Sequence, residues 1–405
     1  MRLLAIVQWL CMIPVIVGSG YAAFCLVAAL RLRREAARHL PQSVSAWPPV
    51  TVLKPVHGLE KGLRENLRST CLQDYPEFQV VCSVQRHDDP AIPLLREIQQ
   101  EFGADRVTVA IENRYAGPNG KINNLIGGLA HARHDVLVIS DSDVQLRPDY
   151  LKTIVAPLAD PEVGYVCTLY KAIGAHSWFE KLELLTLNAE FLVNFTFARG
   201  FGAADFCLGA STALRRSDLE AIGGLVSLAD YLVEDFEMGR RFWAAGKRFV
   251  ILPYLVDTVV DLKTPAQWWH HQVYWDQNNR AARPGAHFST FLIRPVPFAL
   301  LFAVARLGDP LGLAVLAGTV TWRLVTVAMM MGGAFRDREG LRSLPWLPLR
   351  DVASLVSWGL SFTKSTTVWR GAEFVLTHDG RLAAQEVSEC EGSSSPATTS
   401  VSPSP

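Results

Sequence analysis

Residues 135–143 read Asp-Val-Leu-Val-Ile-Ser-Asp-Ser-Asp, and this stretch is the most informative part of the chain. Its apolar run, residues 136–140, has the length and composition of a buried strand, and it ends in Asp141 and Asp143. Ligands of open α/β sheets bind at the carboxyl ends of the strands. Carboxylate oxygens suit Mg²⁺ or Mn²⁺ carrying a diphosphate. Asp141 and Asp143 are therefore candidate metal ligands, and an acidic turn after a buried strand is the alternative.

The segments around this stretch alternate between strand and helix patterns. The expected strands are residues 50–53, 78–84, 107–111, 136–140, 163–169, 206–214 and 249–252. The expected helices are residues 59–71, 91–102, 121–132, 150–158, 178–197, 216–222 and 236–245. Early alternation of this kind predicts a Rossmann-like half with parallel strands and crossover helices, and the later segments make the domain mixed α/β.

Apolar zones flank this domain. Residues 3–30 carry no charge and can cross a hydrocarbon layer of about 30 Å, so we expect an uncleaved membrane anchor. Four arginines follow and place that end in the cytoplasm by the positive-inside rule: Arg31, Arg33, Arg34 and Arg38. A second zone, residues 291–334, is interrupted by prolines and charges and fits one or two spans or re-entrant pieces. Residues 352–362 are too short for a span and suit the membrane interface.

These patterns divide the chain into six parts. They are an N-terminal transmembrane anchor (1–34), a linker (35–48), a cytosolic α/β domain (49–285), C-terminal membrane or interfacial helices (286–370), a short polar segment (371–386) and a disordered tail (387–405). The 39 basic and 39 acidic residues balance, so composition indicates no nucleic-acid partner. The seven cysteines show no C-x-x-C spacing, which argues against a zinc site or a disulfide frame.

Several short motifs lie at the ends of the expected elements. They are Val-Leu-Lys-Pro-Val-His-Gly (52–58), Val-Gln-Arg-His-Asp-Asp-Pro-Ala-Ile (84–92), Gly-Lys-Ile-Asn-Asn-Leu (120–125), Asp-Ser-Asp (141–143), Gly-Ala-Ser-Thr-Ala-Leu-Arg (209–215), Gly-Gly-Leu (223–225) and Glu-Asp-Phe-Glu-Met (234–238). Together with the membrane segments, their order and spacing resemble the ceramide glucosyltransferase family, glycosyltransferase family 21. The resemblance covers residues 49–283 and implies a GT-A nucleotide-diphosphate-sugar domain with a Rossmann-like mixed sheet, flanked by N-terminal and C-terminal transmembrane helices.

The resemblance also implies roles for individual residues. It assigns Asp89 to the nucleotide pocket, Asp141 to the metal and diphosphate site, and Asp235 to general-base catalysis. An inverting transfer needs one carboxylate to take the proton of the acceptor hydroxyl, which is the role expected of Asp235. Adjacent carboxylates such as Glu234 and Asp235 can equally be first-turn partners of a helix dipole. The expected nucleotide-sugar site comprises Lys54, Asp89, Lys121, Asp141, Glu234, His271, Tyr274 and Trp275, with Asp141 and Asp143 holding Mg²⁺ or Mn²⁺.

Lys121 and the segment 270–275 leave alternatives open. Lys121 follows a glycine-containing loop and can reach the diphosphate, or it can be a solvated loop lysine. The family usually has an arginine before the tryptophan of its lipid-proximal motif, where this chain has Tyr274 before Trp275. His270, His271 or Arg280 can replace that cation, and the tryptophans can instead form an interfacial aromatic belt. This departure looks more like the bacterial hopanoid-associated branch of the family than the animal ceramide enzymes.

The sequence therefore predicts a membrane-bound, metal-dependent, inverting glycosyltransferase that moves a sugar from a UDP-sugar to a hydroxyl of a membrane lipid. A hopanoid polyol with UDP-N-acetylglucosamine is favoured over ceramide with UDP-glucose. The expected location is multi-pass in a membrane, with the bacterial inner membrane favoured and the catalytic domain cytoplasmic. A processive polysaccharide synthase is the alternative enzyme class, and an inactive nucleotide-sugar-binding scaffold is the non-enzyme alternative.

Overall fold

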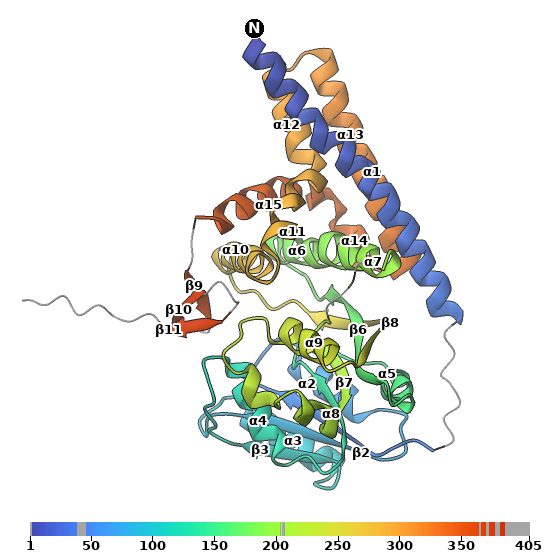
Figure 1. The fold of residues 1–405 in the computed structure, drawn as a ribbon, viewed down its shortest axis with the longest axis vertical. Coiled ribbons are helices and arrows are strands. Elements are labelled where there is room, and N and C mark those ends of the chain that lie inside the picture. Colours follow the sequence, from blue (N-terminus) through green and yellow to red (C-terminus); the bar gives the residue numbers. More distant parts are fainter. Residues whose placement is uncertain are drawn as a thin grey trace, which may run out of the picture.

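The computed structural model describes residues 2–38, 46–202, 204, 207–363, 366–369, 372–376 and 381–384. An α/β domain forms one end of the molecule, a layer of helices covers it, and a group of long helices extends from that layer (Figure 1). Part of the expected linker 35–48 and the whole of the expected tail 387–405 lie outside the described residues.

An eight-stranded sheet forms the centre of the α/β domain. Its strands are β1 Val50–Pro55, β2 Phe78–Val84, β3 Val107–Ile111, β4 Val136–Ser140, β5 Val144–Gln145, β6 Val163–Ile173, β7 Ser211–Arg215 and β8 Arg248–Val259. The strand order is β3-β2-β1-β4-β7-β6-β8-β5. The first four strands in this order run parallel, and β7 is antiparallel to both β4 and β6. The expected mixed α/β sheet with a parallel, Rossmann-like half is confirmed.

Alternation along the strands feeds two hydrophobic cores, one on each face of the sheet. In β4, Leu137 and Ile139 belong to one core, whereas Val136 and Val138 belong to the other, as the two-residue period of a strand requires. The first core is shared with α4 Gly120–Leu129, α8 Arg216–Ala221 and α9 Glu234–Ala244. The second core is shared with α2 Leu63–Cys71, α3 Ile92–Phe102, α5 Tyr150–Val155 and the short η1 Ala156–Ala159.

Three elements begin at different residues from those expected. Helix α2 begins at Leu63 instead of residue 59, because Gly62 adopts a left-handed conformation with φ 76° just before it. Strand β7 begins at Ser211 instead of residue 206, which leaves residues 207–210 as a loop. Helix α9 begins at Glu234 instead of residue 236, so the Glu234–Asp235 pair is inside its first turn. The last two differences decide the geometry of the site described below.

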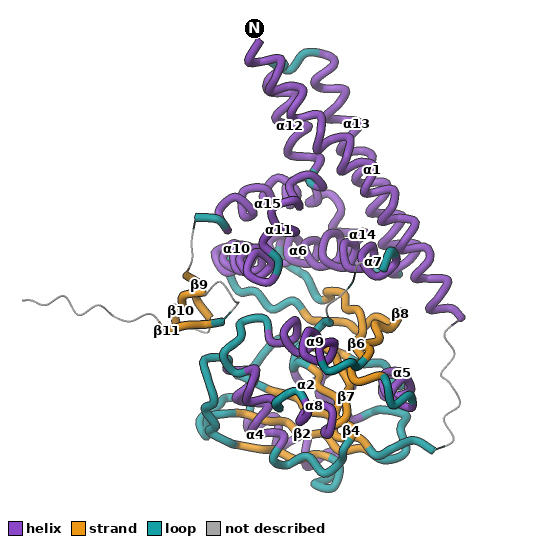
Figure 2. The backbone as a smooth tube through the Cα atoms, in the orientation of Figure 1, coloured by secondary structure: helices purple, strands orange, loops and turns teal. Residues whose placement is uncertain are grey.

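A layer of helices lies above the sheet, on the side of β6 and β8 (Figure 2). It contains α6 Trp178–Leu185, the π-helical η2 Thr186–Phe191, α7 Leu192–Gly200, α10 Pro265–Ala282, α11 Pro284–Ser289, α14 Arg338–Ser343 and α15 Leu347–Ser361. The expected helix 178–197 is thus present, but it is interrupted by one π-helical turn. Short 3₁₀ turns complete the fold: η3 Leu225–Leu228, η4 Thr290–Ile293 and η6 Leu344–Trp346.

The helices that project from this layer are α1 Arg2–Arg38, α12 Pro295–Ala305 and α13 Pro310–Met329. Helix α13 continues into the π-helical η5 Met330–Phe335. Two helices are long and apolar enough to cross a membrane, Ile6–Ala37 and Pro310–Phe335. A third candidate is the pair Pro284–Ile293 and Pro295–Ala305, which is bent by 54°. The described part of the chain therefore has two or three candidate spans, within the range expected from the sequence.

Helix α1 also packs against the helical layer and the core of the α/β domain. Its last third packs on the helical layer, where Arg199 Nη1 lies 2.7 Å from Glu35 Oε2. A Cβ at Gly200 would lie 3.3 Å from the Cβ of Ala28, so the two helices are in close contact there. Cys25, Ala29 and Leu32 of α1 join the core on that face of the sheet and fix the membrane helices against the α/β domain.

A small antiparallel sheet follows α15 and was not expected. It consists of β9 Thr366–Trp369, β10 Ala372–Leu376 and β11 Leu382–Ala384. Helices up to residue 370 and a short polar segment at 371–386 were expected in its place. The error arose because strands of three to five residues carry little periodicity against which a pattern can be judged.

Asn188 holds the π-helical turn to the sheet. Its side chain accepts a hydrogen bond from the N–H of Ala172 (2.7 Å) and donates to Ala172 O (2.9 Å) and to Asp337 Oδ2 (2.8 Å). Asn188 is fully buried, so we expect Asn188→Ala to destabilise the fold by at least about 2 kcal/mol, because it leaves both Ala172 backbone groups without a partner. Thermal unfolding in detergent should show a lower midpoint for this variant. Asn279→Ala, an exposed change on α10, is the control, and equal midpoints for both variants would refute the assignment.

Candidate active site

The polar motifs meet at one edge of the sheet. Strands β1, β2 and β4 run parallel, so their carboxyl ends lie on the same side. Lys54 is the next-to-last residue of β1, Asp89 lies in the loop after β2, and Asp141 follows β4 directly. Helix α4 begins near the same edge and carries Lys121 in its first turn. The structure therefore brings four separate sequence motifs to one place.

Lys121 is the centre of a charged cluster. Its Nζ atom lies 2.8 Å from Asp141 Oδ1 and 3.2 Å from Glu234 Oε1. The exposed fraction of the side chain is only 18% for Lys121 and 11% for Glu234. Lys121 is thus a partly buried cation that links the end of β4 to the start of α9, and the solvated-loop alternative does not describe its position.

Asn119 and Asn123 hold the loop that precedes Lys121. Asn119 caps α4 by accepting from the N–H of Ile122 (3.0 Å), and its amide donates to Tyr231 O (2.9 Å) and Glu234 Oε2 (3.1 Å). Asn123 accepts from the N–H of Ala116 (2.8 Å) and donates to Gly117 O (2.7 Å). The start of α4 and the start of α9 are therefore joined by the hydrogen bonds of Asn119 as well as by the Lys121 ion pair.

Asp235 lies beside this cluster, in the first turn of α9. Its Oδ1 atom accepts a hydrogen bond from the N–H of Phe236 (2.8 Å), a contact typical of first-turn carboxylates. The 207–210 loop passes directly against it, because a Cβ placed on Gly209 would lie 2.8 Å from both Cβ and Oδ2 of Asp235. The N–H of Asp141 donates to Ala210 O (3.0 Å), so this loop also contacts the end of β4. Asp141 and Asp235 thus flank one short glycine-containing segment.

The environment shifts the protonation of all three groups. Burial and the neighbouring Glu234 carboxylate together raise the pKa of Asp235 to about 7, against the opposing effect of Lys121. Burial also raises the pKa of Asp141 to about 6, against the opposing effect of Lys121. Burial alone would lower the pKa of Lys121, but Asp141 and Glu234 raise it above its usual range. The cluster therefore contains a permanent cation and a carboxyl group poised to exchange a proton near neutral pH.

Asp141 and Asp143 have free carboxylate oxygens that could bind a divalent ion. Lys121 engages one oxygen of Asp141, and Thr258 Oγ1 donates to one oxygen of Asp143 (2.6 Å), so each carboxylate has a second oxygen to offer. Among the described residues no group of three or more His, Cys, Asp or Glu side chains is arranged to hold a metal. Mg²⁺ and Mn²⁺ that accompany a nucleotide diphosphate need only one or two carboxylates, because phosphate and water supply the other ligands. The two aspartates fit such an ion.

Lys54 and Asp89 occupy the base of this edge. Lys54 is fully buried, and its ammonium donates to Asp141 O (2.7 Å) and Val144 O (3.0 Å). Burial lowers the pKa of Lys54 to about 8. Both oxygens of Asp89 accept from the N–H of Gly58 (3.1 Å each), and Oδ1 also accepts from the N–H of Ala91 (2.9 Å). In the structure these two side chains hold the backbone of the loops on which the site is built.

His271, Tyr274 and Trp275 form a second group on α10. His271 Nδ1 lies 2.7 Å from Glu183 Oε1, and the indole N–H of Trp275 donates to His271 Nε2 (2.8 Å). The rings of His271 and Tyr274 stack with centroids 6.3 Å apart. Trp275 contacts Phe191 of η2. These three residues therefore lie together, and a layer of aromatic side chains separates them from the carboxylate cluster.

That layer contains Tyr170, which sequence reasoning missed. Its ring stacks on Phe191 with centroids 5.0 Å apart. Burial and the nearby carboxylates, first Asp235 and then Asp141, raise the pKa of Tyr170 well above its usual range. Strand β6 continues to residue 173, past the expected end at 169, and the extra residues place Tyr170 next to the cluster. The alternation of β6, followed further, was the signal that could have found it.

Arg283 is a second residue that was missed. It ends α10, and its guanidinium carbon lies 5.7 Å from the centre of the Phe236 ring, one residue from Asp235. Of the cations considered as replacements for the absent arginine at Tyr274, His270 is exposed and Arg280 lies over Phe362 (5.9 Å). Arg283 is therefore the α10 cation that the structure places against the start of α9.

Comparisons with known proteins agree with this geometry. Ceramide glucosyltransferase 1 of Caenorhabditis elegans is 23% identical over 360 residues, covering 84% of this chain and 74% of that protein. A probable glycosyltransferase of Bacillus subtilis, YdaM, is 24% identical over 64% of this chain and 63% of its own length. The solved structure of the mannosyltransferase PcManGT from Pyrobaculum calidifontis, in complex with GDP-Man and Mn²⁺, superposes with a TM-score of 0.50 at 20% identity, covering 86% of this chain and 98% of its own.

The structural similarity confirms the expected GT-A-like fold with its mixed sheet. The family model described as glycosyl transferase family 21 matches residues 10–382, which includes the α/β domain, the helical layer and the candidate spans. The chain is therefore a glycosyltransferase and belongs to glycosyl transferase family 21, the family of the ceramide glucosyltransferases.

Proposed function

We propose that this protein transfers a hexose or N-acetylhexosamine from a UDP-sugar to a hydroxyl group of a membrane lipid, with inversion at the anomeric carbon. The observation that carries the proposal is the position of Asp235, a carboxyl group with a pKa of about 7 beside the Lys121 cluster. A general base is most effective when its pKa lies near the working pH. The candidate spans, which hold the site against a bilayer, support a lipid acceptor.

In this proposal Asp235 takes the proton of the acceptor hydroxyl while that oxygen attacks the anomeric carbon. The bond between the sugar and the diphosphate breaks, and UDP leaves. Glu234 and Asn119 hold the first turn of α9, so the base is set in a fixed direction. Gly209 leaves the space that the carboxyl group occupies.

The leaving diphosphate needs positive charge near Asp141. Lys121 supplies one cation there, and Arg283, at the end of α10, is a second candidate. We propose that Asp141 and Asp143 also hold Mg²⁺ or Mn²⁺, as the Mn²⁺ complex of PcManGT suggests. When bound, this ion offsets the negative charge that develops on the diphosphate. Asp89 and Lys54 shape the nucleotide side of the site through the loops that they hold.

The acceptor is proposed to enter from the helical layer, where His271, Tyr274 and Trp275 lie. A hopanoid polyol with UDP-N-acetylglucosamine as donor is favoured by the Tyr274 departure and by the resemblance to the hopanoid-associated branch. Ceramide with UDP-glucose fits the relatives equally well, because the named relatives include ceramide glucosyltransferases. Both acceptors present a hydroxyl on an apolar body and use the same residues. A bacterial inner membrane is the proposed location.

The function is tested with the full chain purified in detergent. It is incubated with UDP-glucose or UDP-N-acetylglucosamine, with Mn²⁺ or with EDTA, and with ceramide or bacteriohopanetetrol. Mass spectrometry then identifies any glycolipid. We expect one donor and acceptor pair to give product with the ion and none with EDTA. Absence of product from every combination would overturn the proposal.

Asp235→Asn should abolish transfer while leaving UDP binding intact. The amide has nearly the same shape but cannot accept the proton, so kcat should fall by a factor of about 10² to 10⁴. Calorimetry should show UDP affinity close to that of the unaltered protein. Asp74→Asn is the control, because Asp74 is an exposed carboxylate that pairs with Lys152 (2.8 Å) outside the cluster, and its loss should leave kcat unchanged. Full transfer activity in Asp235→Asn would refute its role as base.

The pH dependence of kcat/KM should report the Asp235 carboxyl group. The base acts only when ionised, so kcat/KM should rise with pH through a midpoint near the pKa of about 7 and reach a plateau above it. Protonation of Asp141, whose pKa is about 6, should steepen the loss of activity on the acid side. Initial rates at low donor concentration measure this profile, with UDP binding followed separately at each pH. A profile that is flat from about pH 5 to 9 would contradict the assignment.

Gly209→Ala should damage catalysis without unfolding the protein. The added Cβ would lie 2.8 Å from Asp235 Oδ2, so the carboxyl group must move, and a displacement of about 1 Å can cost about 100-fold in kcat. Gly285→Ala is the matched control, because a Cβ there meets nothing within 4 Å. Steady-state kinetics and thermal unfolding should show a lower kcat with an unchanged melting midpoint. Equal kcat values for the two variants would mean that Gly209 does not set the position of Asp235.

A further inference from the structure

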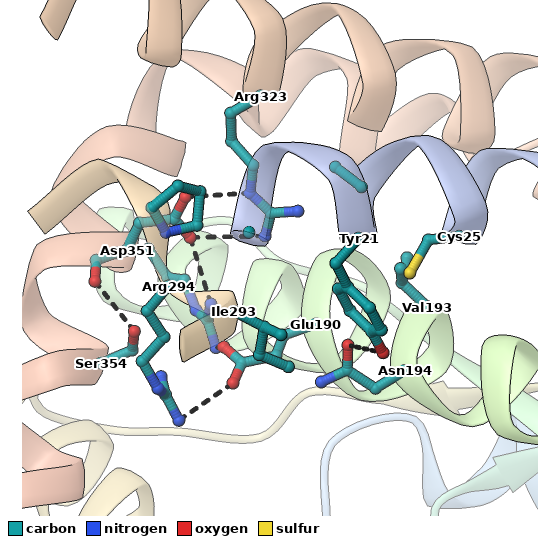
Figure 3. A pocket seen from close by; sticks show the side chains of 14 residues that line it. Tyr21, Cys25, Glu190, Val193, Asn194, Ile293, Arg294, Arg323, Asp351 and Ser354 are labelled. Carbon is teal, nitrogen blue, oxygen red and sulfur yellow. Dashed lines mark hydrogen bonds and ion pairs between the residues drawn. The ribbon is translucent and has the colours of Figure 1, made fainter. Parts of the chain in front are cut away.

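A second polar site lies on the other side of η2 from the carboxylate cluster. A partly open pocket of about 30 Å³ lies there. Its charged lining is Glu190, Arg294, Arg323, Arg350 and Asp351, with Tyr21 of α1 on the opposite wall. Figure 3 shows Arg294 and Glu190 facing one another, with Arg323 and Asp351 paired above them. We call these residues the arginine pocket.

The bonds inside the arginine pocket leave one side chain incompletely paired. Arg350 Nη2 contacts Glu190, its Nη1 lies 3.2 Å from Asp351 Oδ1, and its Nε donates to Thr186 Oγ1 (3.2 Å). Arg323 Nε lies 3.0 Å from Asp351 Oδ2. Both carboxylates of the lining are thus engaged by arginines.

Arg294 differs from these arginines. Its side chain is 8% exposed and its Nη2 lies 3.1 Å from Glu190 Oε1. Its Nε and Nη1 atoms are buried and have no hydrogen-bond partner among the described residues. A guanidinium carries five N–H donors, so three of those of Arg294 are unsatisfied. Leaving such donors buried and unpaired is costly, and a bound hydrogen-bond acceptor would remove that cost.

The unpaired donors of Arg294 decide which ligand the pocket would take. Burial would raise the pKa of Glu190, but the surrounding arginines hold it down at about 2, so Glu190 stays ionised. The lining holds three guanidinium groups against two carboxylates, and Asp276 approaches Arg294 from α10 at 3.6 Å as a third carboxyl group. Burial raises the pKa of Asp276 to about 6, so the charges nearly balance at neutral pH. What the pocket lacks is therefore hydrogen-bond acceptors for three N–H groups, and the oxygens of a phosphate group accept such bonds strongly.

The walls of the pocket indicate that this group belongs to a lipid. Tyr21 and Arg323 lie on the two candidate spans. Apolar side chains on the same two helices are exposed: 44% for Val17 and 57% for Phe24 on α1, and 45% for Val325 on α13. Acyl chains can cover these side chains while the head group reaches Arg294, which stands where the spans join the helical layer.

We propose that the arginine pocket binds the phosphate of a membrane phospholipid that is not a substrate of the transfer reaction. This site lies beyond the proposed function, since the acceptor hydroxyl must reach Asp235 on the other side of Phe191. The two sites share η2, in which Glu190 faces the arginine pocket and Phe191 stacks on Tyr170 beside the catalytic cluster. A bound phospholipid would therefore hold the same turn that lines the catalytic side.

The proposal is tested by lipid binding without any measurement of transfer. The full chain is purified in detergent, delipidated and titrated with phosphatidylglycerol, with diacylglycerol of the same acyl chains, and with inorganic phosphate. Native mass spectrometry counts bound molecules. We expect one phosphatidylglycerol per chain, retained at low concentration, and no retention of diacylglycerol or inorganic phosphate. Equal retention of diacylglycerol would overturn the phosphate assignment, and binding of inorganic phosphate alone would overturn the lipid assignment.

Variants locate the binding in the pocket. Arg294→Gln should weaken phosphatidylglycerol binding by at least about tenfold, because charged hydrogen bonds are lost. Arg342→Gln, which removes an exposed arginine from α14, is the control for general attraction to anionic lipid and should change binding little. UDP affinity confirms that each variant is folded. Unchanged binding in Arg294→Gln would refute the site.

If Arg294→Gln does not fold, a conservative variant tests the role of Arg294 in lipid binding. Arg294→Lys keeps the positive charge that faces Glu190 but removes the planar set of donors, including Nε. We expect it to fold and to bind phosphatidylglycerol more weakly than the unaltered protein, by a factor of at least about three. Affinity equal to that of the unaltered protein would contradict the role assigned to the unpaired donors.

Discussion

The catalytic edge depends on the ion pair that Lys121 makes with Asp141 and Glu234. Three carboxyl groups lie close together at the junction of β4, α4 and α9, in partly buried surroundings. Bringing carboxylates together away from water is strongly unfavourable unless a cation is placed among them. Lys121 meets that requirement for Asp141 and Glu234 at distances of 2.8 and 3.2 Å, and it leaves Asp235 as the group whose ionisation is least favoured. One lysine thus holds the cluster together, whereas burial and the Glu234 carboxylate set the proton affinity of the proposed base.

Hydrogen bonds to the main chain fix the positions of that lysine and its partners. Asn119 ties the first turn of α4 to the segment before α9, Lys54 holds the carbonyls of the Asp141–Val144 turn, and the Asp89 carboxylate gathers backbone N–H groups of two loops. All these bonds are to the main chain, which makes them insensitive to the sequence of the loops they hold. The catalytic residues therefore sit on loops whose backbone is held from below, a common arrangement for sites at a sheet edge.

The π-helical turn η2 links this edge to the membrane side of the molecule. An added residue in a helix rotates the side chains that follow it, and π-turns of this kind often occur at functional sites. Here consecutive residues point to different surroundings, Glu190 to the arginines and Phe191 to Tyr170 and Trp275. Asn188, another residue of η2, holds this turn against β6. The catalytic side and the arginine pocket therefore share one rigid element.

Much of the fold could be predicted because its signals are local. The apolar run before Asp141, the alternation of strands and helices up to residue 140 and the long uncharged segment near residues 3–30 each follow from burial and periodicity. Asp141, Lys121, Glu234 and Asp235 were named as site residues from motifs at the ends of such elements. The loop 207–210, the π-turn and the three short strands after α15 were not predicted, since none has a periodic pattern of its own.

The sequence by itself determined the fold class, the family resemblance and which residue types are available at the edge of the sheet. Only the tertiary structure decided what each of them touches. Lys54 and Lys121 are both lysines at element ends, yet one is buried against backbone carbonyls and the other lies between two carboxylates. The length of β6 sets the position of Tyr170, and the path of the 207–210 loop sets that of Gly209. The end of α10 sets the position of Arg283. The physical reason is that burial and charge partners are properties of packing between distant segments, and these properties set pKa and orientation, which no local pattern encodes.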